Sequence, residues 1–364
     1  MGPRWAVLAL AVAMLMATPT VIGRLPVEPV PISAVELLGK VARSVDTPYS
    51  GYAESVGGLA LPDADQLSSL SELFGDTTRT RVWWRRRDSW RVDTVRPTGE
   101  RDLYGDATGT WRWDYEANTA VRSGDLAVRL PRAADLVPAE LGRRLLSEAD
   151  PGEVQRLPAQ RIAGRDAPGL RLRPADARST ISSVDVWVDA SSGVPLRVLV
   201  HPVGEDRATI TSSFLDFSTA EPDAATTSFT PPPAARVRIE QSNDLLAVAQ
   251  RLTNAKAPER LAGFVRRDGL AGLAPTGGVA VYGRGVSAMV AVALSGRSAR
   301  DLRTQLGKAP EVRTDATGIA LTVGPLNLRL TDSSGRNPVW LLAGSVTPDT
   351  LAAAAAELAT GPAR

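Results

Sequence analysis

The chain has 364 residues, with 42 Lys and Arg against 40 Asp and Glu, one His and no Cys. That length suits two domains that each bury a core without covalent staples. The absence of Cys excludes disulfides and thiolate metal sites, and a single His excludes a multi-His metal cluster. The near balance of charge argues against a polybasic nucleic-acid arm, so the composition favours binding over catalysis.

The first 24 residues carry the pattern of an export segment. Arg4 precedes an apolar run over 5–17, and the small residue Gly23 follows it. A basic start followed by an apolar stretch of this length is typical of a secretory signal peptide. With the two apolar residues before Gly23 the run reaches the roughly 20 residues of a membrane span, so an uncleaved anchor is the alternative. Either prediction places the body of the protein at the outer face of the cytoplasmic membrane.

Two amphipathic helices are predicted before the first sheet. Ser33 and Glu36 have the spacing of a capping box. Behind it, one apolar face is expected to contain Val35, Leu38, Val41 and Val45. A second short helix is expected over 65–74, with Gly75 as its stop signal. Both helices need an apolar surface to cover.

From Arg79 the apolar period changes to two, which predicts strands. The turn at 86–89 and later turns are too short for parallel crossovers, so 79–115 is predicted to be an antiparallel meander. The apolar residues expected on its inward face are Val82, Trp84, Trp90, Val92, Trp111 and Trp113.

After a predicted helix over 136–149, strands resume. Val alternates with other residues over 184–189, and a turn at 191–193 leads into the next strand. The residues expected on the inward face of these two strands are Val184, Val186, Val188, Leu196 and Val198. The prolines at 231–233 cannot join a sheet interior and are predicted to mark a domain boundary.

The segment 240–364 mixes strand and helix patterns and is predicted to form a small α+β domain. Strands are expected over 279–282, 288–294, 319–323 and 340–344, and helices over 298–306 and 347–358. The last helix has Thr347 as N-cap and Pro348 at its first position.

Several motifs in this order resemble the LolA-like lipoprotein carriers. The runs that carry the resemblance are Trp90–Asp93, Gly99–Glu100, Trp111–Tyr115, Val186–Asp189 with Gly193–Arg197, Phe214–Phe217 and Phe229–Pro232. The run Tyr49–Tyr52 is similar to the RseB (MucB) branch of that superfamily, the extracytoplasmic regulators of anti-sigma factors. That branch has a second, smaller C-terminal domain, as is predicted here.

The resemblance covers about residues 35–233 and implies a fold. It implies an α+β protein with a curved, incomplete antiparallel β-barrel and a helical lid over an apolar cavity. The predicted organisation is an export segment at 1–24, a LolA/RseB-like half-barrel at 33–233 and a small α+β domain at 240–364. The residues predicted on the inward face become the cavity candidates, and the opposite face is the alternative if the register shifts by one. Arg86 matches the basic position that locks the lid in carriers, although Arg87 stands where the pattern has Pro.

The function implied by the resemblance is regulatory binding without catalysis. Lipid or lipoprotein acyl chains would enter the cavity, and their occupancy would change contact with a membrane partner such as an anti-sigma factor. One alternative is a lipoprotein or lipid carrier without a signalling role, and another is a structural envelope module with a solid core. No cofactor, metal or nucleic acid is expected.

Three patterns imitate other chemistries. The alternation of Arg and aromatic residues over 79–91 resembles a nucleic-acid surface, but Arg on a solvated strand face explains it more simply. The run Gly283–Ala288 imitates a dinucleotide fingerprint but lacks a following helix, so a tight hairpin is predicted. Asp185 and Asp189 could form an acid–base pair, although turn-capping or solvated roles are favoured, and His201 is expected at a strand end.

Overall fold

The computed structural model describes residues 30–57, 77–96, 99–124, 131–240, 255–267, 278–309, 312–332 and 338–360. The export segment predicted at 1–24 and the helix predicted at 65–74 lie outside these residues. Within them, no helix is both long and apolar enough to cross a membrane.

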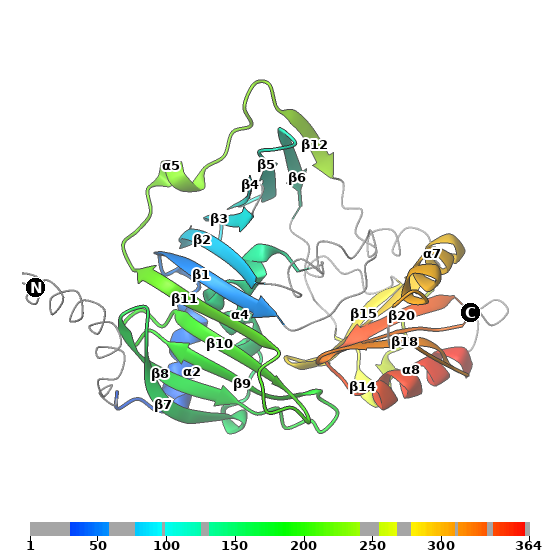
Figure 1. The fold of residues 1–364 in the computed structure, drawn as a ribbon. Coiled ribbons are helices and arrows are strands. Elements are labelled where there is room, and N and C mark those ends of the chain that lie inside the picture. The colour runs from blue at the N-terminus through cyan, green and yellow to red at the C-terminus, as the bar shows by residue number, and fades with distance from the viewer. Residues whose placement is uncertain are drawn as a thin grey trace, which may run out of the picture.

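A twelve-stranded sheet forms the larger part of the molecule (Figure 1). Its strands are β1 (Tyr49–Gly57), β2 (Thr77–Arg86), β3 (Ser89–Arg96), β4 (Gly99–Asp106), β5 (Gly109–Asp114), β6 (Thr119–Ser123), β7 (Val154–Ile162), β8 (Arg165–Leu172), β9 (Ile181–Val188), β10 (Pro195–Pro202), β11 (Ile210–Ser218) and β12 (Arg236–Glu240). The order is β12-β6-β5-β4-β3-β2-β1-β11-β10-β9-β8-β7, so the curved sheet remains open, with β12 and β7 as its edges. Every pairing is antiparallel except that of β12 with β6, which confirms the antiparallel meander.

Helices α2 (Ala34–Arg43) and α4 (Pro138–Leu146) cover one face of this sheet, which we call the helix-facing side (Figure 1). The capping box is confirmed, because the Ser33 amide donates to Glu36 and the Glu36 amide donates to Ser33 Oγ. The buried residues of α2 are Leu37 and Val41, whereas Val35, expected on the apolar face, is 50% exposed. Leu37 and Leu38 are adjacent, so the sequence allows either of them to face the sheet. In the structure Leu37 is the buried one.

Short 3-10 turns complete the helix-facing side. They are η1 (Ser44–Asp46), η2 (Ala133–Leu136) and η3 (Pro151–Glu153). The Leu136 carbonyl accepts hydrogen bonds from the hydroxyls of Ser55 on β1 and Ser212 on β11. These bonds satisfy buried polar groups and fix η2 over the centre of the sheet.

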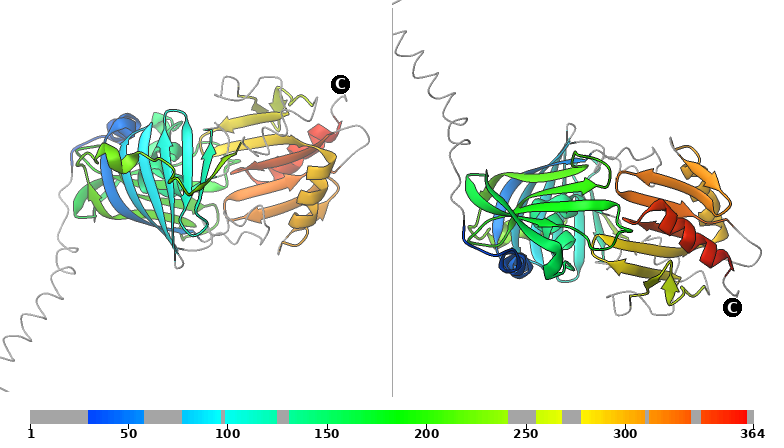
Figure 2. Two further views of the ribbon diagram at one scale, coloured as in Figure 1. Left: turned by 90° about the horizontal axis from the view of Figure 1, so that it is seen from above. Right: turned by 90° about the horizontal axis from the view of Figure 1, so that it is seen from below.

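A second sheet has six strands in the order β15-β16-β20-β19-β18-β17. Its elements are β15 (Val279–Arg284), β16 (Ser287–Leu294), α7 (Gly296–Leu306), β17 (Arg313–Asp315), β18 (Gly318–Val323), β19 (Leu326–Leu330), β20 (Val339–Gly344) and α8 (Pro348–Thr360), with a small hairpin of β13 (Arg260–Leu261) and β14 (Phe264–Val265) beside them. Figure 2 shows α7 and α8 on opposite faces of this sheet. Leu306 of α7 and Leu351 of α8 belong to separate apolar clusters, so alternate strand residues serve two cores.

The elements expected in the C-terminal segment match the structure within a few residues, and the run Gly283–Ala288 forms the tight hairpin between β15 and β16. Gly283 and Gly285 both adopt positive φ, at 76° and 52°. Glycine adopts these angles without the steric cost that a side chain would add. The glycines therefore serve the hairpin turn and not a phosphate-binding loop.

Candidate functional site

Four predicted cavity residues lie together on the helix-facing side of β2 and β3. The strand register places Val82 opposite Val92 and Trp84 opposite Trp90. The rings of Trp84 and Trp90 stack at 5.9 Å, and Tyr49 of β1 stacks on Trp84 at 6.0 Å. The Trp84 indole N–H donates to the carbonyl of Val45 in η1, 2.9 Å away. These contacts pack the aromatic residues against one another and against the covering turn.

The valines predicted further along the sheet also lie on the helix-facing side. Val184, Val186, Val188 and Val198 pack in one cluster with Leu37 and Val41 of α2 and Leu146 of α4. Each of these four valines is 0% exposed. Leu196, at an irregularity in the β9–β10 register, is equally buried but belongs to the cluster that contains Trp84. This end of the sheet is filled by helix side chains.

Trp111 and Trp113 were expected on the same face as Trp84, and the structure places them on the other one. The register runs from Val92 to Leu103 and from Leu103 to Arg112, so the indoles point away from α2 and α4. Tyr104 shares their face, and Phe229 covers all three rings at centroid distances of 4.7–6.0 Å. We call this the linker-facing side, because the segment 224–235, which leads to β12, covers it. Of the strands that carry predicted cavity residues, β5 is thus the one whose residues lie on the opposite face from the prediction.

The structure does not place Arg86 against a helix. Its guanidinium pairs with Asp88 in the β2–β3 turn, and its side chain is 57% exposed. Arg143 of α4 has the contacts that were expected of Arg86. It stacks over the Trp84 ring at 5.1 Å, and its guanidinium donates to the Ser44 carbonyl beyond α2. Arg143 therefore joins both covering elements to the sheet.

A pocket of about 380 Å³ lies between the two sheets. Its lining residues are Leu145, Glu148, Ala149, Glu153, Leu172, Pro174, Asp176, Phe264, Val265, Arg267, Gly283, Arg284, Gly285, Val286 and Ser287. They come from the end of α4, η3 and the end of β8 on one side, and from β14 and the β15–β16 hairpin on the other. Both apolar side chains and five charged residues line this pocket.

The β15–β16 hairpin docks into the large sheet beside this pocket. Val286, at its tip, is 6% exposed and packs in the cluster of Leu172, Val184 and Leu146. The carbonyl of Val286 accepts a hydrogen bond from the Ser179 hydroxyl at 3.1 Å. An apolar residue of the second sheet thus completes a core of the first.

Arg284 adds an ionic anchor to the same hairpin. Its guanidinium contacts both carboxylate oxygens of Glu153, at 2.8 and 3.1 Å, and the Asp150 carboxylate at 2.6 Å. Burial alone would raise the pKa of Glu153, but backbone N–H donors of Asp150 and Ala175 and the guanidinium of Arg284 hold it below its ordinary value. Glu153 is therefore charged at neutral pH and binds the hairpin as an anion.

Main-chain hydrogen bonds also cross between the two sheets. Ser179 forms a bridge with Val346, and the Thr180 amide donates to the Ser345 carbonyl at 3.1 Å. The guanidinium carbon of Arg178 lies 3.5 Å from the centroid of the Phe264 ring at the pocket wall. Hydrogen bonds between the segments 179–180 and 345–346 therefore hold the two sheets together beside the pocket.

The carboxylates considered for acid–base chemistry have structural partners. Asp185 pairs with Arg171 through both oxygens, at 2.5 and 2.6 Å, and His201 Nε2 lies 3.5 Å from it. Asp189 accepts hydrogen bonds from Ser191 and Ser192 in the turn that follows, which is the predicted capping role. These bonds keep the pKa of Asp189 below its ordinary value in spite of its burial, so it is not poised to transfer a proton.

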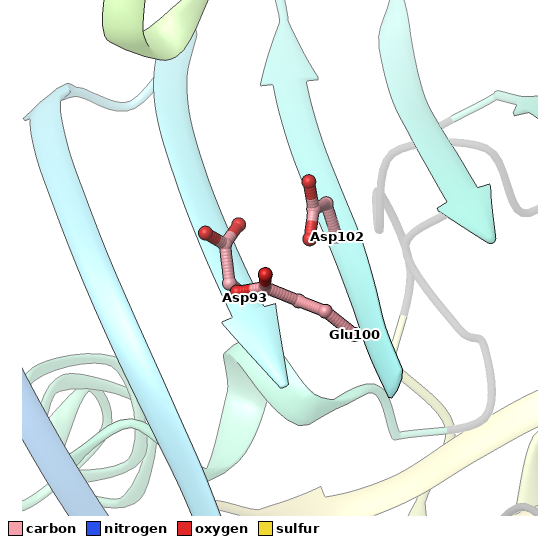
Figure 3. A group of neighbouring side chains, drawn as sticks. All are labelled: Asp93, Glu100 and Asp102. Carbon is pink, nitrogen blue, oxygen red and sulfur yellow. The ribbon is translucent and has the colours of Figure 1, made fainter. Parts of the chain in front are cut away.

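A cluster of three carboxylates on the linker-facing side was not predicted from the sequence. Asp93 of β3 and Asp102 of β4 lie directly opposite each other, and Glu100 lies nearby on the same face (Figure 3). The sequence held a signal for this pairing. Arg96 of β3 pairs with Gly99 of β4, so residues equally distant from this pair, such as Asp93 and Asp102, lie across from each other.

By sequence, no family model and no curated protein matches this chain. By structure, it is similar to MucB in complex with MucA(peri), with 15% identity and a TM-score of 0.49 over 89% of this chain and 97% of that one. The Pseudomonas aeruginosa MucA/MucB complex gives 15% identity and a TM-score of 0.48 over 88% of this chain and 96% of that one. A LolA superfamily protein from Nitrosomonas europaea gives 17% and 0.26 over 54% of this chain and 98% of that one. MucB and the LolA superfamily are the two groups that the sequence motifs resemble.

Proposed function

We propose that this chain is a non-enzymatic regulatory protein that binds an apolar ligand in the pocket between its two sheets. One observation carries the proposal: the pocket of about 380 Å³ takes its walls from both sheets. A ligand in such a pocket contacts two bodies at once, so its binding free energy can change how they are held together. Ligand occupancy is thereby coupled to the shape that the protein presents to a partner.

The lining supports acyl chains or an apolar peptide as the ligand. Leu145, Leu172, Phe264 and Val286 supply apolar surface, and the volume is at the lower end of the roughly 300–1,000 Å³ of small-molecule sites. The charged Arg267 lies at the same pocket, where its pairing with Glu148 at 2.7 Å leaves the side chain 32% exposed. An acyl chain or an apolar peptide side chain fits the apolar part of this lining.

The proposed location and partner follow from the sequence patterns. The export segment predicted at 1–24 would place the body at the outer face of the cytoplasmic membrane. The resemblance of Tyr49–Tyr52 to the RseB branch favours a membrane anti-sigma factor as the partner. Ligand in the pocket would then alter binding to that partner.

The test is native mass spectrometry of the full chain purified from its host, followed by titration with the lipid that copurifies. Ala149→Trp places an indole in the pocket, whereas Ala220→Trp adds the same ring at an exposed position away from it. We expect bound lipid on the wild type and on Ala220→Trp, and at least about tenfold weaker binding by Ala149→Trp, because the ring occupies the ligand volume. Equal binding by the two variants, or no bound lipid on the wild type, would contradict the proposed site.

A second measurement separates regulation from transport. Pull-down of an anti-sigma factor that added lipid relieves supports the regulatory role. Lipid transfer between vesicles, with no effect of lipid on the pull-down, would instead identify a carrier without a signalling role. A wild type that neither binds nor transfers lipid would favour a structural envelope module.

A further inference from the structure

Three carboxylates meet on the linker-facing side of β3 and β4, away from the pocket. One oxygen each from Asp93, Glu100 and Asp102 lies within 4.8 Å of the other two. Figure 3 shows the three side chains gathered between the two strands. Like charges directly opposite each other destabilise a sheet, so this arrangement has a cost unless positive charge offsets it.

The cluster is buried and incompletely satisfied. The side chains of Asp93 and Asp102 are 2% and 0% exposed. Asp102 Oδ1 and Glu100 Oε1 are both shielded from solvent and accept no hydrogen bond from the residues that the structure describes. A buried carboxylate oxygen without a donor is costly, and so each of these two atoms calls for a partner.

The protein groups at the cluster supply only part of the charge it needs. Arg91 donates to Asp93 Oδ1 at 2.6 Å and to Asp102 Oδ2 at 3.0 Å, and the Tyr104 hydroxyl donates to Asp102 Oδ2 at 3.1 Å. Among the residues that the structure describes, one guanidinium faces three carboxylates, which leaves two negative charges when all are ionised.

We propose that Asp93, Glu100 and Asp102 bind a divalent cation of the calcium class. Calcium takes carboxylate oxygens at about 2.3–2.6 Å, so oxygens on opposite sides of the ion lie up to roughly 5 Å apart. The three oxygens all lie within 4.8 Å of one another, which is compatible with this spacing. Magnesium dehydrates reluctantly and usually keeps several waters, so a site made of protein carboxylates suits calcium better. Arg91 and Tyr104 orient the aspartates by holding their other oxygens.

The experiment measures calcium binding by the full chain in calorimetry and thermal unfolding, after treatment with a chelator. Asp102→Asn removes the most buried ligand. Glu100→Gln changes only the half-buried ligand and leaves the two aspartates and Arg91 in place, so it keeps the test valid if the first variant fails to fold. Asp166→Asn is the matched control, since Asp166 pairs with Arg161 elsewhere on the same sheet.

We expect the wild type and Asp166→Asn to bind one calcium ion and to gain several degrees in Tm when calcium is in excess. Glu100→Gln should weaken binding at least about tenfold, and Asp102→Asn should abolish it. The absence of calorimetric binding by the wild type would overturn the proposal, as would equal effects of Glu100→Gln and Asp166→Asn. A Tm of the wild type that does not change with calcium would also overturn the proposal.

Discussion

The two sides of the large sheet differ in how they are covered. On the helix-facing side, α2 and α4 pack on valines and on the stacked rings of Tyr49, Trp84 and Trp90. On the linker-facing side, the segment 224–235 covers a few aromatic residues through Phe229, and a buried cluster of carboxylates lies on the same side. In this sheet, amphipathic helices cover the face that is continuously apolar, whereas an extended segment covers the face that carries both aromatic and charged side chains.

The largest expected effect is a difference in stability loss between tryptophan substitutions on the two sides of the sheet. Trp84→Ala should lower the free energy of unfolding by about 3–5 kcal/mol, because it opens a cavity under fixed helices. Trp113→Ala should cost less, about 2 kcal/mol, because the linker can move inward and fill part of the space. Urea unfolding measures both values, and equal losses would show that the two coverings are equally rigid.

Arg143 tests how firmly the helices are held on their side. Arg143→Ala removes a buried guanidinium that packs on Trp84 and donates to Ser44, and we expect a loss of about 2 kcal/mol. Its neighbour Arg144 is the control, because its side chain is 57% exposed and its pairing with Asp135 at 3.4 Å is a surface one. Arg144→Ala should change stability by less than about 0.5 kcal/mol. Similar losses in urea unfolding would remove the proposed role of Arg143.

The pH dependence of stability tests whether Asp93 on the linker-facing side titrates on folding. The pKa of Asp93 rises from 3.8 in the unfolded chain to about 7 in the folded one, so the folded state binds more protons between these values. Its contribution to stability is complete below about pH 4 and is lost as the pH rises through 7. The slope should approach about 1.4 kcal/mol per pH unit in chelator.

Asp93→Asn should flatten that slope, because it removes the titrating carboxyl. Asp166→Asn should leave it unchanged. Denaturant unfolding at a series of pH values measures the difference, and a slope that survives Asp93→Asn would assign the titration to another group.

Within strands, the sequence predicted the side-chain directions well. Val82 and Trp84 alternate with Arg81, Trp83 and Arg85. The tight turn at 86–89 then places Val92 and Trp90 of the returning strand opposite them. The prediction fails after β4, where Leu103 and Tyr104 are adjacent apolar residues and give no preferred face. The indoles of β5 were then assigned to the wrong side, since the residue that covers them, Phe229, is more than 100 positions away.

The candidate pocket was beyond sequence reasoning for a similar reason. The run Gly283–Ala288 predicted a hairpin correctly, but no local pattern shows that Val286 enters another core or that Arg284 meets Glu153. The sequence likewise does not show which of the adjacent Arg143 and Arg144 is buried. The position of α4 on the sheet buries Arg143 and leaves Arg144 exposed. Long-range packing therefore selects residues that composition and periodicity leave equivalent.

The strand that follows the prolines has a consequence for how the chain can be divided. β12 pairs with β6 from Arg236↔Thr119 to Glu240↔Ser123, so the chain returns to the large sheet after the stretch expected to end it. A fragment truncated at the prolines would leave the β6 edge without its neighbour, and bare edges recruit other chains into aggregates. Expression of the first part alone should therefore extend through Glu240 if it is to remain dispersed in solution.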